Sequence, residues 1–138
     1  MAKKKKKKHD PDSIRSLTKK LDALFSKFVR WKDEENGLIK CFTCNHRARP
    51  KTMQAGHFIP RQIKATRWDL DNVRPQCYSC NMFYGGRPQD FRDGLLAEGI
   101  DVENLEARRF RPHVTDREAL KSEIEGYSKK LKKMGVKI

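Results

Sequence analysis

Four cysteines are the residues whose chemistry is easiest to predict. They form two C-x-x-C pairs, Cys41 with Cys44 and Cys77 with Cys80. Each such turn presents two thiolates, and two turns complete a tetrahedral Zn²⁺ site. Because four sulfurs leave no open position for water, we expect this zinc to be structural rather than catalytic. Two disulfides, or four free thiols, are the alternative interpretation of the same residues.

A histidine and two asparagines are the other candidates for chemistry. His57 stands in the run Q-A-G-H-F-I-P between the cysteine pairs, Asn72 precedes the second pair, and Asn81 follows it directly. Histidine titrates near neutral pH, which suits a general base that activates water. A histidine beside Phe and Ile is also typical of a buried, hydrogen-bonded side chain, and Asn72 is equally compatible with a plain turn.

Basic residues dominate the composition. The chain of 138 residues carries 32 Lys and Arg against 18 Asp and Glu, a net charge of +14. Such an excess favours a polyanionic partner, and we expect DNA, contacted through its phosphates. Trp68 could stack on an unpaired base or anchor the core. The basic residues in and beside the segment with the cysteines and His57 are Arg47, Arg49, Lys51, Arg61, Lys64, Arg67 and Arg74.

The hydropathy pattern argues against a membrane partner. No apolar run approaches the roughly 18 residues of a membrane helix. The basic start of the chain is not followed by the apolar segment of a secretory signal. We therefore expect a cytoplasmic protein whose cysteines stay reduced. Residues 1–9, with six consecutive lysines, are expected to form a disordered tail, either a phosphate-binding arm or a solvated end.

The elements that must position these residues follow from length and periodicity. We expect a single domain over residues 10–138. It divides into an N-terminal helix within 10–35, a zinc-bound core over 38–86 and a helical part over 87–138. The predicted fold class is therefore a small α+β fold that is mainly helical, with a zinc-stapled core.

Two amphipathic helices are predicted at the ends of this domain. The first begins with Asp10 as N-cap and Pro11 at the first helical position. The second follows the capping box T-D-R-E at 115–118 and ends at Gly135. Its apolar stripe consists of Leu120, Ile124, Tyr127, Leu131 and Met134. This spacing fits packing on the same domain, and it also fits the seam of a coiled-coil homodimer.

The order of elements between the cysteine pairs resembles the HNH (ββα-metal) nucleases. We predict a strand over 53–59, a loop over 61–70, a second strand over 72–76 and a helix from about Ser79. The resemblance implies a treble-clef-like core in which the zinc clamps the two strands to the helix. The first strand would carry the histidine, and the helix would supply a metal ligand.

The chain also resembles the NinG/Rap recombination proteins of lambdoid phages, which are themselves HNH-like. The resemblance covers roughly residues 20–132, and the C-C-N ending is also similar to phage endonuclease VII, a junction resolvase. The motifs that carry it are C-x-x-C at 41–44, A-G-H-F at 55–58, R-x-D-x-x-N at 67–72, Q-C-x-x-C-N at 76–81, G-G at 85–86, F-R-x-G-L at 91–95 and Tyr127-x-x-x-Leu131.

This resemblance implies a structure-selective DNA endonuclease that cuts branched recombination intermediates, such as Holliday junctions and D-loops, in the host cytoplasm. A catalytic Mg²⁺ or Mn²⁺ would act beside the structural Zn²⁺. His57 would be the general base, Asn81 would bind the catalytic ion, and Asn72 would hold the loop so that His57 points inward. Because a junction needs two incisions, the expected partners are branched DNA, other recombination proteins and a second copy of the chain.

One position departs from the pattern. Many HNH enzymes carry an aspartate or histidine directly before the base as a metal ligand, and this chain has Gly56 there. The nearby oxygen donors Gln54, Asp69 and Asp71 do not stand at that position. His113 could reach the site, although a surface position is expected for it. The alternative function is therefore a non-catalytic zinc module that binds branched or single-stranded DNA in recombination.

Overall fold

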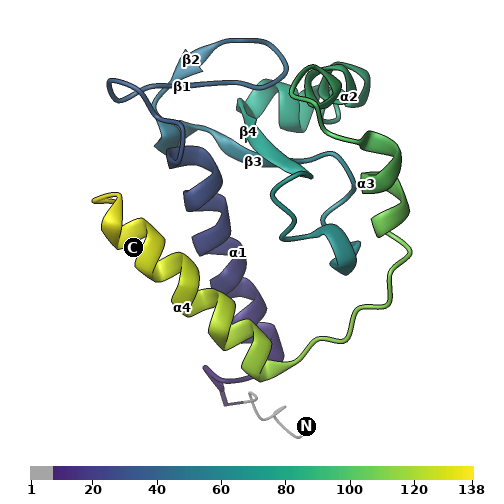
Figure 1. The fold of residues 1–138 in the computed structure, drawn as a ribbon. Helices are drawn as coiled ribbons and strands as arrows, with labels where there is room; N and C mark the ends of the chain where they lie inside the picture. The colour runs from purple at the N-terminus through teal and green to yellow at the C-terminus, as the bar shows by residue number, and fades with distance from the viewer. Residues whose placement is uncertain (1–7) are drawn as a thin grey trace, which may run out of the picture.

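The computed structural model describes residues 8–138 (Figure 1). The predicted basic tail therefore lies outside the described residues, apart from Lys8 and His9. The small α+β class is confirmed, and no helix among residues 8–138 is both long and apolar enough to cross a membrane. The elements in chain order are α1 (Ile14–Trp31), β1 (Ile39–Lys40), β2 (Arg47–Ala48), η1 (Pro50–Thr52), β3 (Gln54–His57), η2 (Lys64–Thr66), β4 (Val73–Gln76), η3 (Ser79–Phe83), α2 (Pro88–Ala97), α3 (Val102–Arg108) and α4 (Arg117–Lys133).

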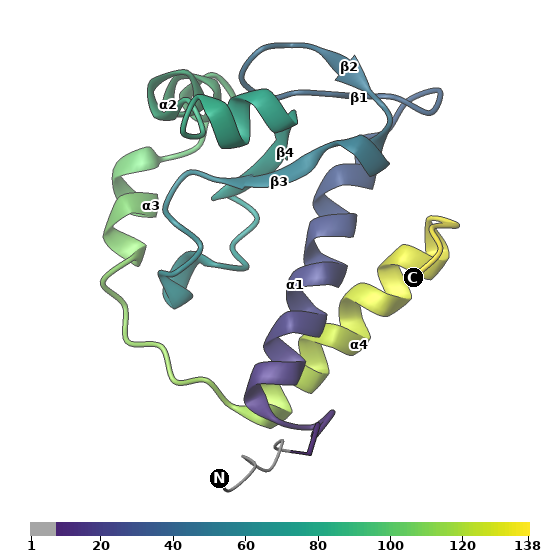
Figure 2. The same cartoon turned by 180° about the vertical axis from the view of Figure 1, so that it is seen from behind.

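The long helices α1 and α4 lie side by side and run in the same direction (Figures 1 and 2). Helix α1 begins at Ile14 rather than at Asp10, because Ser13 is its N-cap and accepts a backbone hydrogen bond of 3.1 Å from the first turn. Helix α4 is capped by the carboxylate of Asp116 rather than by Thr115. Both helices are present as predicted, with their starts displaced by local capping.

The apolar stripe of α4 packs on α1. The ring of Tyr127 lies 5.4 Å from that of Phe25 and 5.2 Å from that of Phe28, between centroids. The buried side chains of this interface are Leu17, Leu21, Leu24, Leu120, Ile124 and Leu131. Met134, the last residue of the stripe, is exposed. The stripe is used within the chain, so it does not supply the seam considered for a homodimer.

Strands β3 and β4 form an antiparallel hairpin at the C-terminal end of α1 (Figure 2). Its register pairs His57 with Val73 and Gln54 with Gln76. Val73 packs against α1, so the face that carries His57 is the face toward this helix. Gln76 and Gly56 lie on the opposite face. The hairpin therefore has one side covered by α1 and the other covered by the cysteine-bearing turns.

Helices α2 and α3 form a second, smaller core on the other side of the hairpin (Figure 1). Phe91, Leu95, Val102 and Leu105 are fully or almost fully buried there, together with Ile59 from the loop after β3. This cluster anchors the loop that follows His57, so the C-terminal part of the chain supports the geometry of the central hairpin.

Candidate functional site

The four cysteine sulfurs converge as the C-x-x-C spacing predicts. All four Sγ atoms lie within 4.8 Å of one another, and those of Cys44 and Cys77 are 3.7 Å apart. A tetrahedral site with Zn–S bonds of about 2.3 Å places its sulfurs about 3.8 Å apart. The sulfurs therefore fit a zinc ion, with Cys41 and Cys80 buried beneath the other two. In residues 8–138 this is the single group of three or more His, Cys, Asp or Glu side chains that converges in this way.

Hydrogen-bond donors reach two of the four sulfurs, and among the thiols only the pKa of Cys41 is lowered, whereas burial raises the pKa of Cys44 to about 12 and raises that of Cys77. The backbone N–H of Cys77 donates to Cys41 Sγ at 3.3 Å, and Arg87 Nε donates to Cys80 Sγ at 3.1 Å. Burial works to raise the pKa of Cys41, but donors from Cys77, Thr43 and Cys44 outweigh it and bring this pKa down to about 6. Cys41 is therefore prepared to bind a metal at neutral pH.

His57 lies at the end of β3 and opens on a cleft of about 290 Å³ between β3 and α1, called here the His57 cleft. Its Nε2 is 2.9 Å from the carbonyl oxygen of Arg67. Because a carbonyl can only accept, Nε2 carries the proton and Nδ1 keeps a lone pair in the neutral ring. The cleft is lined by Asp22, Phe25, Ser26, Arg30, Met53, Gln54, Ala55, His57 and Arg61.

The electrostatic surroundings keep this imidazole neutral. Burial is the largest effect and lowers the pKa of His57 below its ordinary 6.5. The Arg67 carbonyl raises this pKa, the charge of Arg61 lowers it, and the charge of Asp22 raises it, with a net lowering. His57 therefore has the protonation state that a general base needs at neutral pH.

Asp22 supports the Arg67 carbonyl that holds His57. Asp22 was not among the residues predicted from the sequence. Its carboxylate accepts from Arg67 Nε at 2.9 Å, from Arg67 Nη2, and from Trp68 Nε1 at 2.9 Å. These bonds fix the backbone at 67–68, whose carbonyl accepts the His57 N–H. A signal was present, because Asp22 is the single acidic residue of helix α1, which carries five basic residues. Trp68 anchors this contact with its indole N–H.

Asn72 ties down the loop between the two strands. Its side chain is 0% exposed, its Oδ1 accepts from Ile59 N–H at 2.7 Å, and its Nδ2 donates to the carbonyls of Ile59 at 3.0 Å and Thr66 at 3.1 Å. Every side-chain bond of Asn72 is thus to the loop backbone. This arrangement closes the loop immediately after His57.

Gly56 is packed against a neighbouring side chain that fills the space a ligand would need. A Cβ atom built at Gly56 would lie 1.9 Å from Gln76 Oε1. Gln76 is 0% exposed, and its Nε2 donates to Gly86 O and Thr43 Oγ1, both at 2.9 Å. These acceptors fix the amide so that Oε1 faces Gly56 without a hydrogen-bond donor. An aspartate or histidine at 56 would therefore displace the buried Gln76.

Asn81 is linked to the His57 cleft by a hydrogen bond to Gln54, which lines the cleft. The side chains of Asn81 and Gln54 are hydrogen-bonded, with 2.6 Å between Nδ2 and Oε1, and Gln54 lines the cleft. This bond uses the amide nitrogen of Asn81 and leaves its Oδ1 for another partner.

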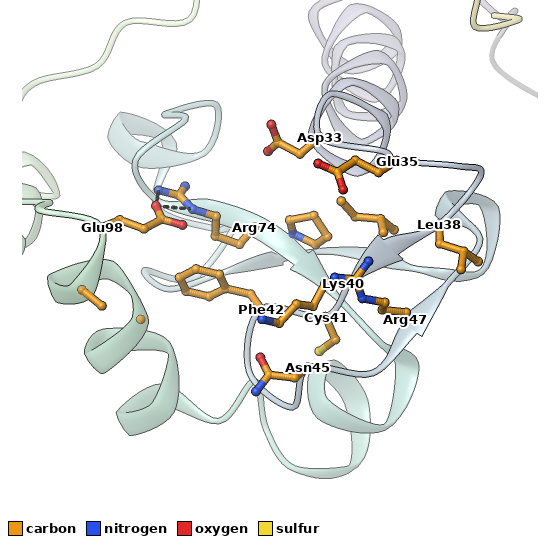
Figure 3. A pocket seen from close by; sticks show the side chains of 14 residues that line it. Asp33, Glu35, Leu38, Lys40, Cys41, Phe42, Asn45, Arg47, Arg74 and Glu98 are labelled. Atoms are coloured by element: carbon orange, nitrogen blue, oxygen red, sulfur yellow. Dashed lines mark hydrogen bonds and ion pairs between the residues drawn. The ribbon is translucent and has the colours of Figure 1, made fainter.

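The predicted DNA-contacting residues divide into two groups. Five are exposed, namely Arg47, Arg49, Lys51, Arg61 and Lys64. Arg67 pairs with Asp22, as described above. Arg74 is 8% exposed and pairs with Glu98 at 2.7 Å, along one wall of a cavity of about 520 Å³ (Figure 3). The guanidinium groups of Arg67 and Arg74 already make ion pairs within the chain, and DNA contact by all seven residues stays a prediction.

Three further candidates lie away from the cleft. Asp69 and Asp71 both accept from Arg108 Nη1, at 2.8 and 2.9 Å. The exposed ring of His113 lies 6.4 Å from the ring of Trp68, between centroids. None of the three lines the His57 cleft.

Comparison with known protein families gives a match that covers nearly the whole chain. The family described as "NinG: Bacteriophage Lambda NinG protein" matches residues 1–136. The chain belongs to the NinG family. Membership of the NinG family supports a recombination-related role for the protein and agrees with the resemblance seen in its motifs. No curated protein and no solved structure matches the chain.

Proposed function

We propose that this NinG-family protein is a metal-dependent, structure-selective endonuclease that cuts branched DNA intermediates of recombination, such as Holliday junctions and D-loops. The observation that carries the proposal is the hydrogen bond from His57 Nε2 to the Arg67 carbonyl at 2.9 Å. It leaves Nδ1 as the basic nitrogen of a neutral, half-buried imidazole. The cleft beside this imidazole contains Arg30 and Arg61, so a phosphodiester would meet positive charge there.

In this proposal the residues of the cleft carry out hydrolysis in an HNH-like ββα unit. A water attacks the phosphorus, His57 Nδ1 takes its proton, and the bond from phosphorus to the leaving sugar oxygen breaks. A bound Mg²⁺ or Mn²⁺ would supply charge stabilisation to the phosphate. Asn81 offers one amide oxygen to such an ion, and phosphate oxygens and water complete the shells of many Mg²⁺ sites. Asn72 and Asp22 hold the backbone that positions His57.

The second candidate function is a non-catalytic zinc module that binds branched or single-stranded DNA. Its support is the packing at Gly56, where Gln76 fills the space of the acidic or histidine ligand found in many HNH enzymes. In residues 8–138 no group of three or more His, Asp or Glu side chains converges on the His57 cleft. Both candidates share the DNA surface formed by the exposed residues Arg47, Arg49, Lys51, Arg61 and Lys64.

Labelled four-way junctions separate the two candidates. Zinc-loaded wild-type protein should cut the junction with Mg²⁺ or Mn²⁺ and leave a linear duplex of the same sequence intact. His57→Ala should retain zinc and junction binding and lose cutting. His113→Ala is the matched control, because that histidine is exposed and does not line the cleft. Wild-type protein that binds junctions tightly and never cuts them would exclude the enzyme and leave the binding module.

A further inference from the structure

The segment 78–84, which begins within the second cysteine pair, exposes several aromatic side chains. Tyr78 is 53% exposed, Phe83 76% and Tyr84 58%. With Met82, they account for four of the eleven large hydrophobic side chains that are exposed among residues 8–138, all within 78–84. Exposed apolar side chains that gather in one patch mark interaction sites more often than exposed apolar side chains that are scattered singly. We call Tyr78, Phe83 and Tyr84 the aromatic platform.

Backbone hydrogen bonds of the metal-binding turn and one ring contact hold the aromatic platform. The N–H of Tyr84 donates to Ser79 O at 3.0 Å, and the N–H of Gly86 donates to Cys80 O at 2.8 Å. The rings of Tyr78 and Phe83 meet edge to face, with centroids 5.7 Å apart. A preorganised aromatic surface loses little conformational entropy when a flat ligand stacks on it.

A cation completes the platform and indicates the chemistry of its ligand. The guanidinium carbon of Arg87 lies 4.0 Å from the centroid of the Tyr84 ring, while Arg87 Nε donates to Cys80 Sγ at 3.1 Å. Exposed aromatic rings, one of them with an arginine stacked on it, on a chain of net charge +14, are suited to nucleobases attached to a phosphate backbone. An apolar protein surface would be a poorer match for the arginine.

The platform also lies beside the proposed site of cutting. Asn81 belongs to the same turn as Phe83, and its amide contacts Gln54 of the His57 cleft at 2.6 Å. We propose that the aromatic platform stacks on unpaired bases of branched DNA and so places the branch point next to the cleft. This inference rests on the proposed function, which it extends by naming what distinguishes a branch from a duplex.

The test uses zinc-loaded full-length protein without added Mg²⁺ and three labelled probes, a four-way junction, a 20-nucleotide oligothymidylate and a 20-base-pair duplex. Because stacking of one base contributes about 1–3 kcal/mol, Phe83→Ala and Tyr84→Ala should each weaken junction and oligothymidylate binding about 5-fold or more. Duplex binding and the salt dependence of all three affinities should stay unchanged, because no phosphate contact is removed.

Two variants control the experiment. Phe83→Trp keeps a stacking surface and should bind like wild type. Phe110→Ala removes another exposed aromatic, 83% exposed and with Arg109 over its ring at 5.8 Å, and should change no affinity. Zinc content and thermal melting should match wild type in every variant. A 2-aminopurine at the branch point should change its fluorescence with wild type and not with the Phe83→Ala/Tyr84→Ala double variant.

The outcomes distinguish this inference from the proposed function. Junction binding that depends on Phe83 and Tyr84 without any cutting would refute the nuclease and retain the platform. If the protein cuts junctions and neither Phe83→Ala nor Tyr84→Ala changes its affinities, the platform proposal is overturned and the nuclease proposal is retained. An equal loss on junction, oligothymidylate and duplex, or a double variant that binds all probes as wild type does, would also overturn it, the latter result fitting a protein partner instead.

Discussion

The ion pair between Asp22 and Arg67 should be the most informative contact to break. Asp22→Asn removes the carboxylate that accepts two bonds from Arg67 and one from Trp68. The side chains of Arg67 and Asp22 are only 15% and 22% exposed, so the guanidinium would be left poorly solvated. Losing one partner of a fully buried pair costs about 3–5 kcal/mol, and a charged hydrogen bond contributes about 1.5–3 kcal/mol. Because the pair is partly solvated and Asn keeps an acceptor for Trp68, we expect about 2 kcal/mol.

The same substitution should also change the titration of His57. The negative charge of Asp22 raises the pKa of His57, so its removal should lower that pKa further. Arg61→Gln is the matched control of opposite sign, because the charge of Arg61 lowers the same pKa. Arg61 is exposed, so this control should change stability by no more than about 0.5 kcal/mol.

Urea unfolding of the zinc-loaded protein measures the stability change, and NMR titration of the histidine ring measures the pKa. His57→Ala identifies the His57 resonance among the four histidines of the chain. A loss of less than about 0.5 kcal/mol in Asp22→Asn would contradict a supporting role for this ion pair. Shifts of the His57 pKa in the same direction in the two variants would contradict it as well.

The packing at Gly56, the hydrogen bonds of Asn72, the zinc site and the titration of His57 can each be tested separately. Gly56→Ala should lose about 1–3 kcal/mol by calorimetry, because its Cβ would overlap Gln76, and Gln76→Ala should relieve much of that loss in the double variant. Asn72→Ala should lose at least about 2 kcal/mol, because buried loop groups lose their partners, and a neutral result would contradict the hydrogen bonds described. Chelation of zinc should abolish the cooperative unfolding transition, whereas unchanged circular dichroism would argue against a structural metal. Since His57 has a lowered pKa in the folded state, its contribution to stability should be full above pH 6.5 and decline as the pH falls below that value.

Local patterns predicted the metal-binding turns and the order of the elements. Two C-x-x-C turns carry their geometry within four residues each, so the convergence of Cys41, Cys44, Cys77 and Cys80 could be predicted without knowing the fold. Helical periodicity likewise identified α1 and α4, and only their ends were displaced, since capping depends on which side chain reaches the free N–H groups of the first turn and α4 ends at Lys133, two residues before Gly135.

Contacts between residues that are far apart in the chain could not be predicted from local sequence patterns. Arg74 is predicted to contact DNA, and the structure adds an ion pair with Glu98 at the C-terminal end of α2, a partner that no local pattern indicates. Gly56 was seen as a missing ligand, and the structure gives it a packing role, because Gln76 from the adjacent strand occupies that space. Asp22 supports His57 through Arg67, which lies 45 positions from Asp22 in the chain, so this contact depends on the packing of α1 against the loop of the hairpin.

Chemical rescue would test the central claim most directly. His57→Ala enlarges a cleft of about 290 Å³ and removes only the proposed base. In single-turnover reactions on a four-way junction with Mn²⁺, the variant should bind with wild-type affinity and not cut. Added imidazole should then restore cutting, with a pH dependence that follows its own titration. Cutting by His57→Ala at the wild-type rate without imidazole would contradict the account.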